Sequence, residues 1–460
     1  MTVDTDPERK DIVIIGKAEA KVVYLTNRVC SLETGGGIIG CTTAYYLTRH
    51  PSYNPEKDTI TVLEATRIAG GASGKAGGLL AVWAYPSNIV PLSFKLHSEL
   101  AIEHDGAETW GYRRVSCGNL EATGRRRVDL EKISGSSSTG TGRSLGKRSD
   151  AVKRASSLYP RTGLPRDLDW ILPDLVQSYE KTGGGRETAQ VHPYQFTREM
   201  MRLSEEKGAK LVIGSVTDIN YTDATSSSPP PGHRSGSHSP SGSSVSSLSS
   251  RGRKKVETIS YIDKETGELR TINSTHTIIA AGPWTAKLFP PAPITGLRAH
   301  SVTITPASAV SAYALFTEIS IPGVDGGNPV SPEIYARPNN EIYVCGEGDM
   351  DLEVPESTAD VEVDEERCDN LIAQVSSISD HIRLGRVTRK QACYLPVLDI
   401  GGHGGPLIGE TGIDGLLLAT GHSCWGINNA PATGLLLAEM IFDGKTKSAD
   451  IRNLDPRRIL

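Results

Sequence analysis

A run of glycines near the amino terminus has the residue types and the spacing of a dinucleotide-binding turn. The stretch Gly35-Gly36-Gly37-Ile38-Ile39-Gly40 follows the Gly-x-Gly-x-x-Gly pattern and leads into an apolar segment that predicts a helix. In such a turn, glycines let a pyrophosphate approach the backbone and let the helix pack closely on its strand. The helix N-terminus then faces the anion. Because glycine clusters are common in loops, the hexamer alone is a weak signal. The flanking segments decide whether it is a dinucleotide-binding turn.

Two predicted strands flank the glycine run in the way that a dinucleotide fold requires. Residues 11–15 form a short apolar strand pattern before it, and residues 59–64 form a second strand that ends in Glu64. An acid about 20 residues after the glycines can accept a ribose hydroxyl. The sequence therefore predicts a strand–helix–strand unit that binds a dinucleotide.

Residues 17–34 interrupt this unit between the strand and the glycines. They have no periodicity of their own, and joining Gly16 to Gly36 would restore an uninterrupted strand, turn and helix. The string GGTAAG, which would encode Gly16-Lys17, resembles an intron donor, so we favour a retained intron or a gene-model error. The alternative is an evolved surface excursion, whose closure entropy would be modest. Sequencing the transcript separates the two origins.

Three later junctions of small residues could contact the same cofactor. The loop from Ala69 to Ala81 can lay several N–H groups and the Ser73 hydroxyl along a phosphate or a flavin edge, although a flexible linker is the alternative. A predicted strand ends at residues 281–284, where small residues let the backbone lie against a cofactor. The junction at residues 420–427 leads to a helix with Pro431 near its first turn, whose N-terminus suits a ring that gains negative charge.

The remaining elements are predicted from hydrophobic periodicity. Residues 91–112 resemble a helix, and another begins at Pro193, with His192 as a helix-entry residue rather than a catalyst. Further predicted elements are strands at 210–213 and 216–221, two strands within 255–281, and an antiparallel sheet from segments 297–304, 333–338, 342–347 and 393–396. The Ser/Gly/Pro-rich tracts 134–149 and 222–254 are predicted to be disordered.

Size and composition restrict the class of protein. A chain of 460 residues suggests two interleaved domains, and a net charge of −5 gives no basic footprint for nucleic acid. The seven cysteines are scattered and lack metal-ligand spacing, so we expect reduced thiols, no metal and an intracellular protein. No apolar run approaches the ~20 residues of a membrane span. With an acidic N-terminus unlike a signal peptide, these features predict a cytoplasmic location.

Taken in order, the motifs resemble those of FAD-dependent oxidoreductases of the D-amino-acid oxidase (DAO) superfamily. The resemblance rests on the run ending at Gly40, on Glu64, on the Ser73 loop, on Ala-Ala-Gly-Pro-Trp284 and on Ala-Thr-Gly-His-Ser-Cys-Trp-Gly-Ile427. It extends especially to fungal oxidoreductases of this superfamily, some of them linked to late-endosome-to-Golgi transport, so endosome association is a further expectation. The implied fold class is α/β, with an FAD-binding Rossmann-like domain of the glutathione-reductase type interleaved with an antiparallel β-sheet substrate domain (α+β).

The resemblance also implies how the two domains divide the chain and which residues hold the cofactor. The FAD-binding domain would comprise residues 8–120, 206–290 and 401–460, and the substrate domain residues 121–205 and 291–400. Pyrophosphate would lie on the glycine run, ribose at Glu64, adenine near Val216 and the isoalloxazine along residues 421–427. The expected cofactor-binding residues are Gly16, Gly35, Gly36, Gly37, Ile38, Ile39, Gly40, Glu64, Ala65, Ser73, Gly74, Lys75, Gly77, Gly78, Leu79, Val216, Ala281, Gly282, Trp284, Gly421, His422, Trp425, Gly426 and Ile427.

The implied chemistry is removal of a hydride from a carbon that bears an amine, followed by reoxidation by oxygen or another acceptor. The expected substrate is a small amine or amino acid. Where amino-acid oxidases often carry an arginine in Gly-Leu-Arg-Pro, this chain has Leu395, which cannot pair with a carboxylate. Either Arg337 or Arg298 replaces that arginine, or the substrate is no amino acid. The expected catalytic residues are Arg337, Tyr335, His300 and Trp425; for His300 the alternative is a strand residue bonded to backbone.

Cys393 falls where sarcosine oxidase attaches its flavin covalently. We interpret Cys393 as a buried apolar cysteine instead, so the FAD is expected to be non-covalent. Two other functions stay open. One is a flavin-bound protein with mainly a membrane-trafficking role and little turnover. The other is a nicotinamide-dependent dehydrogenase, which would leave the junction at residues 421–427 without a role.

Overall fold

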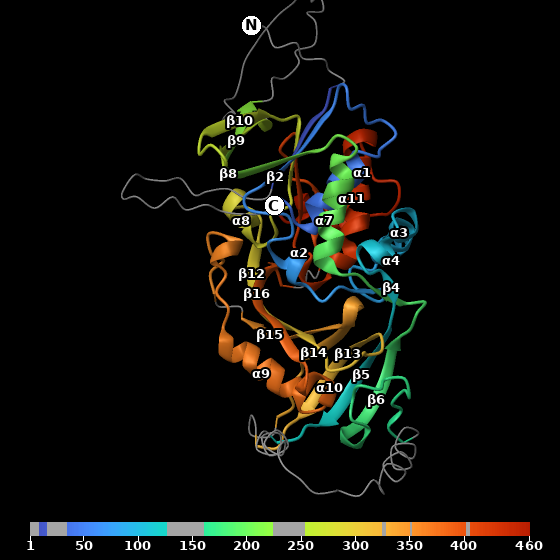
Figure 1. The fold of residues 1–460 in the computed structure, drawn as a ribbon. Helices are drawn as coiled ribbons and strands as arrows, with labels where there is room; N and C mark the ends of the chain where they lie inside the picture. Colours follow the sequence, from blue (N-terminus) through green and yellow to red (C-terminus); the bar gives the residue numbers. More distant parts are fainter. Residues whose placement is uncertain are drawn as a thin grey trace, which may run out of the picture.

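The computed structural model describes residues 9–15, 35–126, 161–223, 254–323, 328–349, 352–401 and 405–460. Gly16, the segment 17–34, the tract 134–149 and residues 224–253 lie outside these ranges, so the expectations about them have no structural outcome. The described chain forms two layered parts, drawn at the top and the bottom of Figure 1.

An eight-stranded sheet forms the core of the upper part, in the order β10-β9-β8-β2-β1-β11-β18-β17 (Figure 1). Its five central strands are parallel and read as runs of Ile, Val and Leu because both faces of the sheet are covered. They are β8 (Lys210–Asp223), β2 (Thr59–Glu64), β1 (Asp11–Ile15), β11 (His276–Ile279) and β18 (Leu416–Thr420). The antiparallel edges are β9 (Lys254–Asp263), β10 (Leu269–Asn273) and β17 (Leu407–Glu410).

The predicted strands of this sheet are present, with two differences in their bounds. The segments 210–213 and 216–221 form one continuous strand, β8, whose register against β9 is irregular. The prediction of disorder was wrong at both ends of the tract 222–254, because Thr222 and Asp223 continue β8 and pair with the start of β9 at Lys254. Residues 255–281 form three strands rather than two, because the chain leaves β10 at Asn273 and crosses to the centre of the sheet as β11.

Four helices pack together in the upper part: α1 (Ile38–Leu47), α3 (Val90–Glu103), α7 (Pro193–Glu205) and α11 (Gly426–Asp443). Helix α1 is buried between α7 and α11 and has no charged residue. A Cβ atom added to Gly434 of α11 would lie 2.6 Å from the carbonyl oxygen of Thr42. The hydroxyl of Thr42 in turn donates to the carbonyl of Ala430 at 3.0 Å. The two helices therefore approach as closely as their backbones allow.

Helix α11 begins at Gly426, so the prediction that Pro431 lies near its first turn was wrong. Proline inside a helix leaves the carbonyl four residues earlier without its N–H donor. Here that carbonyl belongs to Ile427, and the Nε2 atom of His97 on α3 lies 2.9 Å from it. Burial lowers the pKa of His97 to about 4, so the ring is neutral and Nε2 carries the proton in this bond. The ring of His97 on α3 thus replaces the donor that Pro431 lacks, and α11 can begin five residues before this proline.

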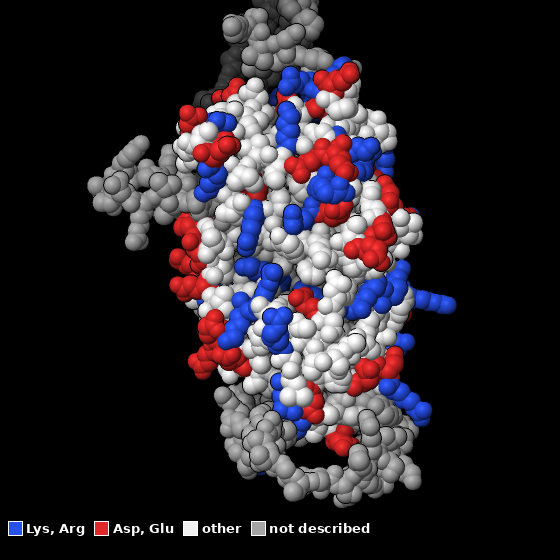
Figure 2. Space-filling view, viewed as in Figure 1, with Lys and Arg blue, Asp and Glu red and all other residues white. Residues whose placement is uncertain are grey.

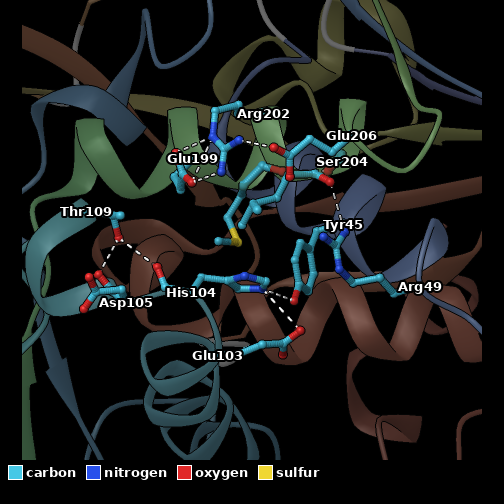
Figure 3. Close-up of polar contacts among 12 residues, drawn as sticks. Tyr45, Arg49, Glu103, His104, Asp105, Thr109, Glu199, Arg202, Ser204 and Glu206 are labelled. Atoms are coloured by element: carbon cyan, nitrogen blue, oxygen red, sulfur yellow. Dashed lines mark hydrogen bonds and ion pairs between the residues drawn. The ribbon is translucent and has the colours of Figure 1, made fainter.

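Helix α3 ends at Glu103, whereas the sequence pattern predicted a helix to residue 112. The chain turns at Asp105, which has a positive φ of 51°, and resumes as the short helix α4 (Gly106–Thr109). Figure 3 shows why it turns there: the Nε2 atom of His104 lies 2.7 Å from the hydroxyl of Tyr45 on α1, and the hydroxyl of Thr109 donates to the Asp105 carbonyl at 2.9 Å. Both contacts fix a bend that periodicity alone does not reveal.

A seven-stranded sheet forms the lower part, in the order β16-β12-β15-β14-β13-β5-β6. The antiparallel sheet predicted from four segments is confirmed, with one parallel pair between β13 and β5. Its strands are β16 (Arg386–Leu398), β12 (Ile294–Thr305), β15 (Glu341–Asp349), β14 (Glu333–Arg337), β13 (Tyr313–Ser320), β5 (Ser116–Thr123) and β6 (Val176–Gly183). Helix α9 (Glu365–Ser376) and the short α10 (Asp380–Arg383) pack on one face.

The two parts meet at short elements that carry the second glycine-rich loop. Helix α2 (Ala72–Lys75) lies against α7 and β16, and the strand β3 (Leu79–Ala81) joins a small sheet with β7 (Thr188–Gln190) and β4 (Arg113–Arg114). The short helix α8 (Thr285–Leu288) follows the end of β11. On the face shown in Figure 2, acidic and basic side chains are interspersed over both parts. No helix among the described residues is long and apolar enough to span a bilayer.

Candidate functional site

A pocket opens where the parallel strands β11 and β18 end and where α1 and α11 begin. None of the described residues that line it carries a formal charge, and most are small or apolar. The lining residues are Gly37, Ile38, Ile39, Gly71, Ala72, Ser73, Ala76, Ala280, Gly282, Pro283, Trp284, Leu395, Pro396, Ala419, Thr420, His422, Ser423, Cys424, Gly426 and Ile427. Segments from the beginning, middle and end of the chain therefore converge on one cavity.

The first glycine turn has room for backbone only. A Cβ atom on Gly40 would lie 2.2 Å from the carbonyl oxygen of Gly35 and 3.2 Å from the Ile14 side chain. A Cβ atom on Gly36 would lie 2.5 Å from the Ile68 side chain. The turn therefore sits against strand β1, as it would if residues 17–34 were absent. Its backbone N–H groups lie at the start of α1, where Gly37 is the N-cap residue.

The second loop is tied to the first by two hydrogen bonds. The hydroxyl of Ser73 accepts from the N–H of Ile38 at 2.9 Å, and the N–H of Ala69 donates to the Gly36 carbonyl at 2.9 Å. Ser73 thus occupies the N-terminus of α1, which is the position that an anion takes at a helix start. The two loops form one wall of the pocket.

Glu64 lies behind the first glycine turn rather than in the pocket lining. Its buried carboxylate accepts from the N–H of Gly36 at 2.6 Å, from Thr66 at 3.0 Å and from Arg67 at 3.3 Å. The carboxylate therefore fixes the turn in this structure. Its expected role as the ribose acceptor stays a prediction.

The opposite wall is the strand-to-helix junction before α11. The backbone has a positive φ at Gly421 and at Ser423, which turns the chain sharply into the helix. The ring of His422 is buried and lies 3.1 Å from the Thr433 hydroxyl through Nε2. Burial lowers the pKa of His422 to about 3, so this ring is neutral near pH 7. The Thr420 hydroxyl donates to the Gly282 carbonyl at 3.0 Å and joins the ends of β18 and β11.

A flavin dinucleotide fits this set of groups. The N–H groups of Gly36 and Ile38 are bonded to Glu64 and Ser73, so a pyrophosphate would meet the other N–H groups at the start of α1. The start of α11 offers a second helix N-terminus at the other wall. Glycines at positions 36 and 40 let the turn close against Ile68 and Gly35, where a Cβ atom would collide, and the apolar lining of the pocket suits a flat ring. The pocket needs no charged side chain, because the helix ends supply the positive potential.

Apart from Glu64, the predicted cofactor residues that lie within the described ranges fall into three groups. Gly37, Ile38, Ile39, Ser73, Gly282, Trp284, His422, Gly426 and Ile427 line the pocket. Gly35, Gly36, Gly40, Ala65, Gly74, Lys75, Gly77, Gly78, Leu79, Ala281, Gly421 and Trp425 lie in the adjoining segments without lining it. Val216 is buried in the core on β8, outside the pocket.

The structure does not bring the two candidate arginines to the pocket lining. Arg337 is 4% exposed and donates to the carbonyls of Ala76 and Gly77, the latter at 3.2 Å. It also pairs with Glu341 at 3.0 Å. Arg298 pairs with Asp349 at 3.1 Å. Both guanidinium groups are therefore engaged by the protein, and Leu395 lies in the lining where the sequence comparison would place an arginine.

The other candidate catalytic residues lie outside the lining as well. His300 is buried on β12, and its Nε2 accepts from the backbone N–H of Asp364 at 3.0 Å. Tyr335 is buried on β14 and donates its hydroxyl proton to Glu333. Trp425 adjoins the pocket and has its ring 5.5 Å from that of Trp83. The contact of His300 fits the alternative that it is a strand residue bonded to backbone. The catalytic roles of Tyr335 and Trp425 stay predictions.

Several lining residues lie within the recognised motifs but were not among the expected cofactor-binding residues: Ala76, Ala280, Pro283, Ala419 and Thr420. The signal that could have found them is position, because each lies next to a glycine junction that was recognised.

Cys393 is buried beneath the second loop, and burial raises the pKa of its thiol to about 11. Among the described residues, no group of three or more His, Cys, Asp or Glu side chains could hold a metal ion.

Comparisons with known proteins agree with this geometry. A family model described as "FAD dependent oxidoreductase" (DAO) matches residues 34–440, beginning at the end of the segment 17–34. "Putative oxidoreductase TDA3" of Saccharomyces cerevisiae is 40% identical over 499 residues, which cover 92% of this chain and 93% of the yeast protein. "Putative oxidoreductase C1F5.03c" of Schizosaccharomyces pombe is 33% identical over 431 residues, which cover 92% and 96%. The glycine oxidase structure from Bacillus cereus ATCC 14579 is similar with a TM-score of 0.62 at 16% identity, over 96% of each chain.

Proposed function

Because the chain belongs to the DAO family of FAD dependent oxidoreductases, we propose that it removes a hydride from the carbon beside the nitrogen of a small amine or amino acid. The observation that carries this proposal is the uncharged pocket between the starts of α1 and α11, lined by both glycine-rich loops. The name of glycine oxidase, whose fold the chain shares, supports an amine-bearing substrate. Oxygen or another acceptor would complete the cycle.

The residues of this chain would hold and orient the cofactor rather than exchange protons with it. FAD, when bound, supplies a two-electron acceptor. The turn at Gly36, Gly37 and Gly40 would hold its pyrophosphate, and the junction from Gly421 to Ile427 its ring. The α11 N-terminus stabilises negative charge at that end of the pocket, and the apolar lining excludes water.

We propose that the FAD is bound without a covalent link. Covalent attachment through a cysteine requires the thiolate, and burial keeps the Cys393 thiol protonated near pH 7. Acid precipitation of the protein should leave yellow flavin in the supernatant. Flavin that remains with the precipitate would contradict this proposal.

Two measurements on purified protein test the function. An absorbance band near 450 nm (roughly, as for oxidised flavins) should accompany the folded protein. Anaerobic mixing with a panel of glycine, D-amino acids, N-methylated amino acids and simple amines should bleach that band for at least one compound. A colourless protein that takes up no added FAD would overturn the cofactor assignment. A yellow protein bleached by none of the panel would favour the alternative of a trafficking role with little turnover. The cytoplasmic and endosomal location stays a prediction.

A further inference from the structure

A continuous series of aromatic rings runs from the cofactor pocket down to the seven-stranded sheet. Trp425 lies 5.5 Å from Trp83 and 6.1 Å from Tyr85, measured between ring centroids. Trp83 lies 6.1 Å from Phe316 on β13, and Phe316 lies 6.5 Å from Tyr335 on β14. These contacts are edge-to-face, so ring faces as well as ring edges border the space between them.

One carboxylate lies at the lower end of this ring series. Glu333 precedes Tyr335 by two residues on β14, so both side chains project from the same face of the sheet. Its carboxylate accepts hydrogen bonds from the Tyr335 hydroxyl and, at 3.7 Å, from the Cys345 thiol. Burial raises the pKa of Glu333, and no described cation lies close enough to offset that effect. Burial, and to a smaller extent the charge of Glu333, raises the pKa of Cys424, which lines the cofactor pocket.

A separate hollow opens from Glu333 and Phe316 toward solvent, over strands β5, β6 and β13. Its described lining contains no Lys, Arg or His. Three more carboxylates, those of Glu121, Glu180 and Glu318, line it, and among the described residues none of the four glutamates forms an ion pair. The described lining of the hollow therefore combines four carboxylates with the ring of Phe316.

This arrangement selects cations. Aromatic ring faces attract ammonium groups, and among described residues no Lys or Arg lies over Trp83, Phe316 or Trp425. A partly buried carboxylate such as Glu333 is stabilised in its ionised form by an opposite charge at short range. A substrate carboxylate, by contrast, would meet four carboxylates in the hollow, and none of the described residues that line the hollow or the cofactor pocket is Lys or Arg.

We infer that the hollow and the rings around Glu333 form the binding site for an organic ammonium ion that lacks a carboxylate. This inference rests on the proposed function only in naming that cation as the substrate or as part of it. The binding itself is inferred from the rings and from the four carboxylates, none of which forms an ion pair with a described residue. The substrate class is then an amine rather than an amino acid.

Titration calorimetry of the FAD-loaded protein with benzyltrimethylammonium tests the inference without any turnover. Binding should be saturable and at least tenfold tighter than that of benzoate or of N,N,N-trimethylglycine. Glu333→Gln keeps the size of the side chain and should weaken cation binding by about tenfold, the loss expected for one hydrogen-bonded charge. Glu318→Gln, at the exposed rim, should weaken it less and reduce its salt dependence.

The matched control is Glu56→Gln. It removes the same charge from an exposed site just before β2, in the eight-stranded sheet, whereas the hollow lies over the seven-stranded sheet. It should bind the cation as the parent does. Benzoate that binds as tightly as the cation would overturn the inference, as would parent-like affinity in both Glu333→Gln and Glu318→Gln. Because calorimetry reports binding whether or not flavin is bleached, a protein that binds the cation but oxidises nothing would contradict only the proposed function.

Discussion

At Gly40, a single methyl group decides whether the cofactor turn can close. The Cβ atom of an alanine would lie 2.2 Å from the backbone oxygen of Gly35, which no side-chain adjustment can relieve. Gly40→Ala should therefore lower stability by about 1–3 kcal/mol and weaken FAD binding at least tenfold. Flavin content and the melting temperature measure both effects. Gly401→Ala, where an added Cβ meets nothing within 4 Å, should change neither, and a yellow, parent-like Gly40→Ala would refute the packing argument.

The buried histidines predict how stability depends on pH. His97 has a folded-state pKa of about 4, below the ordinary value of 6.5, so the unfolded chain binds protons that the folded chain does not. The stability it contributes is fully present above pH 6.5 and is lost as the pH falls toward 4. At pH 5 the loss amounts to about 2 kcal/mol, from 1.36 kcal/mol per pKa unit.

His97→Gln tests this linkage, because glutamine retains an N–H donor for the Ile427 carbonyl without a titrating ring. The melting temperature of the parent should fall more steeply between pH 7 and pH 5 than that of His97→Gln. His97→Ala, which leaves that carbonyl without a donor, should lower stability by about 1–3 kcal/mol at pH 7. Equal slopes for the parent and His97→Gln would show that His97 does not titrate as described.

Individual side-chain partners were the least predictable part of the site. The glycines and Ser73 could be found because backbone geometry restricts which residues fit there, and they do line or support the pocket. The sequence offered Arg337 as a free cation, yet its guanidinium is engaged by the carbonyls of Ala76 and Gly77. Those acceptors lie 260 residues away in the chain, so no local pattern indicates them.

Among the secondary-structure elements, the strands were predicted more reliably than the helix ends. The apolar runs at 11–15 and 59–64 form parallel strands, and the alternating segments form the lower sheet. The ends of α3 and α11 differ because tertiary partners decide them: Tyr45 meets His104 at the end of α3, and His97 accommodates Pro431 inside α11. Periodicity reports which face of a helix is buried, not where a distant side chain stops or extends it.

The contact between α1 and α11 predicts a large effect of a small substitution. In Gly434→Val the new side chain would meet the backbone of Thr42 and Thr43, the nearest atom at 2.6 Å. We expect a loss of about 1–3 kcal/mol or more and a reduced flavin content, because both helices begin at the pocket. Leu435→Val places the same side chain at the neighbouring, half-buried position and should cost less than about 1 kcal/mol. Equal melting temperatures for the two variants would contradict the close approach.

For the molecule as a whole, a deletion tests whether the segment 17–34 is part of the cofactor site. Strand β1 occupies the centre of the sheet between β2 and β11, and Gly40 packs against Ile14 of that strand. A variant that joins Gly16 directly to Gly36, and so lacks residues 17–35 with Gly16 in the place of Gly35, should therefore fold and retain FAD at least as well as the parent. Flavin content after gel filtration and the melting temperature of both proteins measure this. A deletion variant that loses its flavin would show that the segment is an integral part of the site.

The central sheet is completed only by residues far along the chain. Strand β11 pairs with β1 on one side and with β18 on the other, and α1 packs on α11, nearly 400 residues later in the chain. During synthesis on the ribosome, the nascent polypeptide therefore carries an exposed strand edge and an uncovered apolar helix until its final segments emerge. Polypeptides cut short before residue 416 would keep those surfaces uncovered, which makes them candidates for capture by chaperones and for degradation.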